Sequence, residues 1–122
     1  MNENRIEDHE ILYRVVKRSY PDAFINGKPS GALFIESNGA SVDRDGGRDE
    51  KTVVDSLKQR FRKEYKTSVY ILAAQCREAG TFPVPNRTKN KYHGEIHESK
   101  DEVEISLLKA LKLAAICQEV AI

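Results

Sequence analysis

The sequence predicts an α+β fold: a single domain spanning residues 1–122, with a mostly antiparallel β-sheet covered by two helices. Three observations favour this class. Segments rich in β-branched and aromatic residues recur along the chain, turn-forming residues separate them, and two longer segments carry apolar residues at helical spacing. A chain of 122 residues is long enough for one ordinary core, and no repeat or long linker divides it.

The composition limits the partners and the cellular compartment that the chain suits. The net charge is only +1, so no overall field draws the chain to nucleic acid or to a membrane surface. The first ten residues are polar and acidic and lack the pattern of a signal peptide, and no apolar run reaches the length of a membrane span. The two cysteines show no metal-like spacing, which favours reduced, buried thiols. We therefore expect a cytoplasmic protein.

The N-terminal third predicts a frayed start and then strands. Residues 1–9 offer little to bury and are expected to fray. Residues 11–17, ILYRVVK, are typical of a strand, and an irregular connection with two prolines and an Asn-Gly pair follows. In residues 31–47, GALFIESNGASVDRDGG, the pair Asn38-Gly39 predicts a hairpin with a type I′ turn. Its outer face would carry Glu36 and Asp43, with Asp45 beyond.

The central and C-terminal segments complete the predicted elements. Residues 48–65 form an amphipathic helix capped by Asp49, and residues 67–80 are interpreted as a strand. Residues 81–91 form a loop with a basic tip, and residues 92–98 alternate like a strand. A second helix begins at Ser99, since Ser99 and Glu102 match a capping box. Its predicted buried stripe consists of Val103, Leu107, Leu111 and Ala114, widened by Leu108, Ala110 and Ala115.

The strongest local signal for chemistry is the pattern His93-x-Glu95-x-His97. On a strand, alternate residues share a face, so two imidazoles and a carboxylate would stand in one row. These groups are ligands for zinc and related divalent metals, which makes His93, Glu95 and His97 a candidate metal site. The alternative is an exposed polar strand face, and no cofactor is firmly implied.

A second interpretation needs no metal. His93 would be a general acid or base, because an imidazole changes protonation near neutral pH, and Asp43 would orient it beside Arg44. This interpretation requires the segment of Asp43 to lie beside the 92–98 strand. The candidate groups that would hold an anion or another ligand are Arg14, Arg87, Lys89, Asn90 and Lys91. No nucleophile motif and no phosphate-binding glycine motif accompanies them.

The basic loop RTKNKYH, residues 87–93, is also a candidate contact for a nucleic-acid backbone. Arg87, Lys89, Lys91 and, at low pH, His93 supply four positive charges, which with one tyrosine make a small footprint, and the basic side of the 48–65 helix would extend it. The nearly neutral net charge argues against this partner.

Three short motifs resemble those of a group of short uncharacterised bacterial proteins. The motifs are Leu12-Tyr13-Arg14, Ser41-Val42-Asp43-Arg44 and Asn90-x-x-His93-x-Glu95-Ile96. The resemblance spans most of the chain, although Lys91 stands where that group has proline. It implies a bacterial origin and no particular activity, and it draws attention to the same positions as the residue patterns.

Two functional hypotheses follow from these patterns. The first is a small bacterial cytoplasmic binding module that presents Asp43, Arg44 and His93 to another protein or an anionic ligand. The alternative is a hydrolase or transferase acting on a phosphate-containing substrate, a nucleotide or nucleic acid, with His93 supported by Asp43 or Glu95. Neither involves a membrane.

Overall fold

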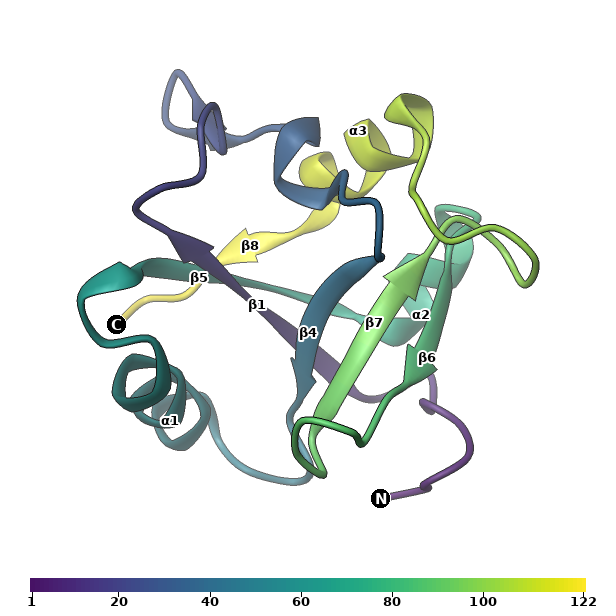
Figure 1. Cartoon of the computed structure of the whole chain (residues 1–122), viewed down its shortest axis with the longest axis horizontal. Coiled ribbons are helices and arrows are strands. Elements are labelled where there is room, and N and C mark those ends of the chain that lie inside the picture. The colour runs from purple at the N-terminus through teal and green to yellow at the C-terminus, as the bar shows by residue number, and fades with distance from the viewer.

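The computed structural model describes all 122 residues and confirms the α+β class in one domain. Six strands form an antiparallel sheet in the order β6-β7-β4-β1-β5-β8 (Figure 1). The elements of this sheet are β1 (Ile11–Lys17), β4 (Ala40–Arg44), β5 (Tyr65–Leu72), β6 (Phe82–Pro85), β7 (His93–His97) and β8 (Gln118–Glu119). The remaining elements are β2 (Phe24–Ile25), β3 (Lys28–Pro29), η1 (Gly31–Phe34), α1 (Glu50–Phe61), η2 (Arg62–Glu64), α2 (Ala73–Glu78) and α3 (Leu107–Ile116).

The two faces of the sheet are covered unequally. One face packs against α2, α3 and η1 and holds the larger core cluster, which includes Leu12, Val16 and Ile96. The other face packs against α1, whose Val53 and Leu57 meet Tyr13 and Val15 of β1 in a smaller cluster. In Figure 1, α1 lies beside β1 and β5, away from β7 and β6. This leaves the β4–β7 part of the α1 face without a helical cover.

Several predicted elements are confirmed. The strand at 11–17 is β1, and the alternating segment 92–98 contains β7. The helix predicted over residues 48–65 is α1, which ends earlier, at Phe61, so that Tyr65 already belongs to β5. Asp49 caps α1 by accepting a hydrogen bond from the Thr52 amide. The predicted strand 67–80 is correct only in its first half. It ends at Leu72, and the alanine-rich second half forms α2, because Ala73 and Ala74 favour helix more than strand.

The hairpin predicted at Asn38-Gly39 is wrong. Residues 31–34 form the 3₁₀ helix η1, and Phe34 is fully buried, so this segment contributes no strand to pair with β4. Gly39 has a φ of +86°, but Asn38 has no positive φ, which a type I′ turn requires. A short Asn-Gly hairpin exists elsewhere: Asn26 and Gly27, with φ of +53° and +77°, join β2 to β3.

The helix predicted from Ser99 begins eight residues later, at Leu107. Ser99 does accept hydrogen bonds from the Asp101 and Glu102 amides, but the chain turns back there instead of continuing as a helix. The buried residues of α3 are Ala110, Leu113 and Ala114, whereas Leu107, Leu108 and Leu111 are exposed. The predicted buried stripe is therefore correct at Ala110 and Ala114 and wrong at its leucines, because a helix apolar on more than one side does not reveal which side is covered.

The N-terminal segment is anchored at Ile6 and Asp8, whereas residues 1–5 are exposed, so the fraying expected of residues 1–9 is corrected only for its second part. Ile6 is fully buried in the larger core cluster, and the Asp8 carbonyl accepts a hydrogen bond from the Ala74 amide. The Asp8 carboxylate also pairs with Arg77 of α2.

The sheet ends in two short edge strands. β6 pairs with β7 on one side only and carries prolines at positions 83 and 85, and β8 has just two residues. None of the helices combines the length and apolar character that a membrane crossing requires.

Candidate functional site

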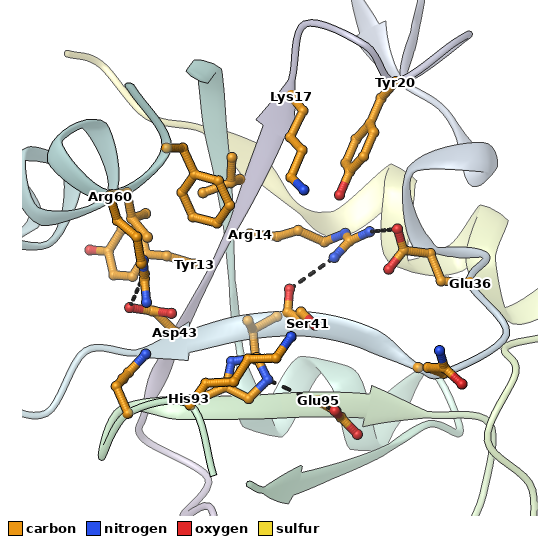
Figure 2. Close-up of a pocket in the computed structure, with 18 residues that line it drawn as sticks. Tyr13, Arg14, Lys17, Tyr20, Glu36, Ser41, Asp43, Arg60, His93 and Glu95 are labelled. Atoms are coloured by element: carbon orange, nitrogen blue, oxygen red, sulfur yellow. Dashed lines mark hydrogen bonds and ion pairs between the residues drawn. The ribbon is translucent and has the colours of Figure 1, made fainter. Parts of the chain in front are cut away.

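A polar pocket lies on the part of the sheet face that α1 leaves open. It has a volume of about 490 Å³. Figure 2 shows side chains from β1, β4 and β7 converging on it, with the end of α1 on one side and the segment around Tyr20 and Glu36 on another. The residues that line the pocket include Arg14, Lys17, Tyr20, Glu36, Ser41, Asp43, Arg60, Phe61, Lys89, Asn90, His93 and Glu95.

Strand register brings Asp43 and His93 together. Asp43 pairs with His93 across β4 and β7, and with Tyr13 across β1 and β4. Directly opposed residues in antiparallel strands point to the same face, so the three side chains stand in one row across the sheet. Ser41 and Glu95 form the next pair along β4 and β7. The adjacency of Asp43 and His93 on which the acid–base hypothesis depends is therefore present.

His93 is 4% exposed, and its Nε2 atom has no hydrogen-bond partner. The nearest carboxylate oxygen to Nε2 in an ion-pair geometry is Glu95 Oε2, at 3.8 Å, which is beyond hydrogen-bond reach. Burial lowers the pKa of His93, and the positive charges of Lys89 and Arg60 add to this, while Asp43 and Glu95 oppose it. With its pKa below the ordinary value, His93 is neutral at pH 7 and can donate or accept one proton.

Arg14 fills the space where β1 and β4 separate. The two strands pair only at Leu12 and Tyr13 on β1. Beyond that point the Arg14 guanidinium donates to the Ser41 carbonyl at 2.9 Å and to the Leu33 carbonyl at 2.8 Å, and it lies 3.3 Å from Glu36 (Figure 2). Arg14 is 3% exposed, so its role is first to satisfy backbone groups of the pocket wall.

Every carboxylate of the pocket already has a partner. Arg14 pairs with Glu36, Arg60 donates to Asp43 at 2.7 Å, and Glu95 interacts with His97 at 2.9 Å and accepts from Asn86 at 3.1 Å. Burial raises the pKa of Glu95, but the hydrogen bonds from His97 and Asn86 outweigh it and hold that pKa below its usual value.

The positively charged side chains of the pocket have fewer ion-pair partners than its carboxylates. Lys17 lies 5.8 Å from the centre of the Tyr20 ring and 5.4 Å from that of Phe61, and its ion pair, with Glu64, is 3.8 Å long and lies outside the pocket. Lys89 contributes positive charge at His93. The pocket therefore has an excess of positive charge and a neutral, unpartnered imidazole.

The structure does not show His93, Glu95 and His97 in the geometry of a metal site. These side chains share a face of β7, as the alternation predicts, yet no three histidine, cysteine or acidic side chains are arranged to hold a metal ion. Glu95 stands between the two histidines and presents a different oxygen to each. A metal would need these donors to converge on one point, whereas here the carboxylate occupies that position.

Arg44 is not part of the pocket, which corrects its assignment beside His93. As the neighbour of Asp43 on β4, it points to the opposite face, where it is fully buried. Its Nε and Nη2 atoms donate to the two carboxylate oxygens of Glu10 at 2.6 and 2.8 Å, and Nη2 also donates to the Arg5 carbonyl. Arg44 therefore ties the N-terminal segment to the sheet.

The other candidate binding residues divide into two groups. Lys89 and Asn90 line the pocket together with Arg14. Arg87 and Lys91 lie in a separate hollow near the N-terminus, where Arg87 pairs with Glu3 at 2.5 Å and Lys91 lies over the Tyr92 ring. The basic loop is thus not one continuous positive surface.

Several pocket residues were not predicted as site residues, among them Lys17, Tyr20, Arg60 and Phe61. Arg60 and Phe61 are the last two residues of α1, and in the sequence Arg60 belongs to the basic, solvent-facing side of that helix. Only the packing of α1 beside β4 turns Arg60 toward Asp43. For Tyr20, in the irregular connection after β1, no local pattern signals a site.

The fold and the pocket together define an α+β domain with a cationic cleft on an open sheet face. The chain matches no protein-family model, no curated protein sequence and no solved structure. The geometry of the pocket therefore carries the functional conclusion.

Proposed function

We propose that this protein is a small binding module whose pocket takes a phosphate-bearing small molecule of about the size of a nucleotide. The observation that carries the proposal is the charge balance of the pocket. Its three carboxylates, Glu36, Asp43 and Glu95, are all partnered, while Lys89 adds positive charge at His93, whose buried Nε2 atom has no hydrogen-bond partner. Buried polar atoms without partners are rare, and a ligand that completed the hydrogen bonding of His93 would explain this one.

The size and walls of the pocket support the same ligand class. A volume of about 490 Å³ lies within the range of small-molecule sites. The half-buried rings of Tyr20 and Phe61 offer apolar surface to an organic ring near Lys17. We also propose that the protein works in a reducing compartment, the bacterial cytoplasm. The two free, buried cysteines and the resemblance to bacterial proteins support this localisation.

Isothermal titration calorimetry with adenosine monophosphate tests the proposal, with adenosine and inorganic phosphate as the two halves of the probe. We expect the monophosphate to bind and adenosine to bind more weakly. Lys89→Gln should weaken monophosphate binding roughly tenfold, because a hydrogen bond to a charged group contributes about 1.5–3 kcal/mol. Lys100→Gln, on an exposed loop outside the pocket, is the matched control and should bind like the wild type.

Binding that is equal in all three proteins, or tighter for adenosine than for its monophosphate, would contradict the proposal. Absence of heat with the monophosphate and with phosphate would also contradict it.

The position of His93 favours a second candidate, a hydrolase or transferase acting on the same ligand class. A neutral imidazole with a free nitrogen beside Asp43 and Glu95 suits general acid–base chemistry. The calorimeter separates the two functions, because a ligand that is converted gives heat that continues after mixing, whereas simple binding gives a heat pulse that returns to baseline. His93→Gln should abolish continuing heat if this alternative is correct.

A further inference from the structure

An apolar surface lies on α3, on the side of the sheet opposite to α1. Leu107, Leu108 and Leu111 are 62%, 66% and 51% exposed, and Ile25 of the short β2–β3 hairpin is 58% exposed. Single exposed leucines are ordinary, but four large aliphatic side chains around one helix form a patch that a monomer rarely leaves in water. We call these four residues the α3 patch.

A groove runs along the α3 patch. It is bounded by Leu107, Leu111 and Ala115 on the helix side and by Ile25 and Pro29 on the hairpin side, and its volume is about 750 Å³. Gly31 lies at its base, where an added Cβ would meet Leu111 Cδ2 at 3.4 Å, so helix and base are already in contact. Leu108 does not line the groove and is the most exposed of the three leucines. The patch therefore has a projecting apolar side chain beside an apolar hollow.

Charge along α3 is arranged in the same self-complementary way. Glu102 and Glu104 are exposed just before the helix begins, and Lys112 is exposed near its end. When two copies of a helix pack antiparallel, the start of each lies against the end of the other. Glu104 of one copy would then lie near Lys112 of its partner, and the reverse.

We propose that the chain forms a twofold homodimer through the α3 patch, with the two α3 helices antiparallel. Leu108 of each copy enters the groove of the other. A twofold interface uses the same surface of both copies, so each copy must supply both the projecting side chain and the groove. The opposite charges at the two ends of α3 fix the antiparallel direction. The ligand pocket is lined by α1 and by no residue of α3, so both pockets remain open in such a dimer.

Sedimentation equilibrium of the full chain tests the dimer. The wild type should be dimeric at micromolar concentration, and Leu108→Glu should weaken association at least tenfold, because it places a charge in the groove of the partner. Ile122→Glu is the matched control: Ile122 is 52% exposed at the C-terminus, outside the patch, and its replacement should leave the dimer intact. Circular dichroism of Leu108→Glu should match the wild type, since Leu108 packs against nothing in the monomer core.

A charge exchange tests the direction of packing. Glu104→Lys and Lys112→Glu should each weaken association roughly two- to fivefold, as expected for exposed ion pairs, and the double variant should restore it. A wild type that stays monomeric at about 100 times higher concentration would overturn the proposal and assign the patch to a different partner. A dimer insensitive to Leu108→Glu would equally overturn it.

Discussion

At the scale of single residues, His93 is the group whose environment most needs explanation. It is almost fully enclosed, and one ring nitrogen lacks a partner, an arrangement that typically costs about 1–3 kcal/mol. Its cross-strand neighbour Asp43 could have charged and anchored the imidazole, but Arg60 takes that carboxylate. The result is a buried histidine whose pKa is lowered by burial and by the positive charges of Lys89 and Arg60.

Residue patterns predicted part of this arrangement. Alternation along the 92–98 segment placed His93, Glu95 and His97 on one face, and the structure agrees. Alternation also separates Asp43 from Arg44, which therefore face opposite sides of β4. The prediction that both residues belong to one site did not take this separation into account. No local sequence pattern indicates that Arg44 pairs with Glu10. Buried ion pairs depend on which distant segments meet, which a single sequence does not reveal.

The first prediction concerns the pKa of His93. Asp43 raises this pKa, so Asp43→Asn should lower it further, and release of the Arg60 charge should act in the same direction. Titration of the imidazole resonances by NMR measures the change. Asp55→Asn, which removes an exposed carboxylate on α1 outside the pocket, is the control and should leave the His93 titration in place. A rise of the pKa in Asp43→Asn would contradict the cross-strand interaction.

The same residue predicts a pH dependence of stability. The folded-state pKa of His93 lies below that of the unfolded chain, about 6.5, so the unfolded chain binds a proton first as pH falls. Stability from His93 is complete above that pH and is lost as pH falls through the folded-state pKa. Urea unfolding at decreasing pH should show this loss in the wild type and less of it in His93→Gln. Lys100→Gln, at an exposed position outside the pocket, is the control and should lose stability as the wild type does.

At the scale of elements, two segments differ from their sequence signals for different reasons. The 31–45 segment contains a strong hairpin motif, but the core takes Leu33 and Phe34 into a 3₁₀ turn beneath α3. The C-terminal helix is correctly predicted as a helix over 107–116 and wrongly oriented, because Leu107, Leu108 and Leu111 are apolar without being covered. Strands with clear alternation and the helix capped by Asp49 were predicted well. Segments were predicted less well where some of their apolar residues lie outside the core.

A prediction at this scale compares two glycines in turns. Gly39 and Gly27 both have positive φ, but a Cβ at Gly39 would lie 2.8 Å from His97 Cδ2, whereas one at Gly27 meets nothing. Gly27→Ala should therefore cost only backbone strain, about 1–2 kcal/mol. Gly39→Ala should cost about 1–3 kcal/mol more, because it also displaces His97 from Glu95. Urea unfolding of both variants measures the difference, and equal losses would contradict the role assigned to the His97 contact.

At the scale of the whole molecule, the sheet separates two environments. Its α2–α3 side holds the larger core and both cysteines, and its α1 side holds the smaller core and the pocket. Fold class and strand content could be predicted, since they follow from periodicity. The pocket could not, because it depends on α1 covering only part of its face and on β1 and β4 separating where Arg14 enters.

The state of the cysteines gives a prediction for the whole fold. Burial raises the pKa of Cys76 to about 12 and that of Cys117 to about 11, so neither forms the reactive thiolate in the folded chain. A disulfide-exchange reagent at pH 8 should detect no thiol in the native protein and two after unfolding in denaturant. Ser37→Cys, at an exposed position, should react at once and shows that the reagent is competent. A native thiol that reacts as fast as this control would contradict the packing of the larger core.

The edge strands have a consequence for how the protein behaves at high concentration. A free sheet edge is a template on which another chain can add a strand, and such addition leads to fibrils. On β6, Pro83 and Pro85 lack the amide hydrogens that an incoming strand would need, and on the other edge β8 offers only two residues. Extension of the sheet by an added strand is therefore disfavoured at both of its edges.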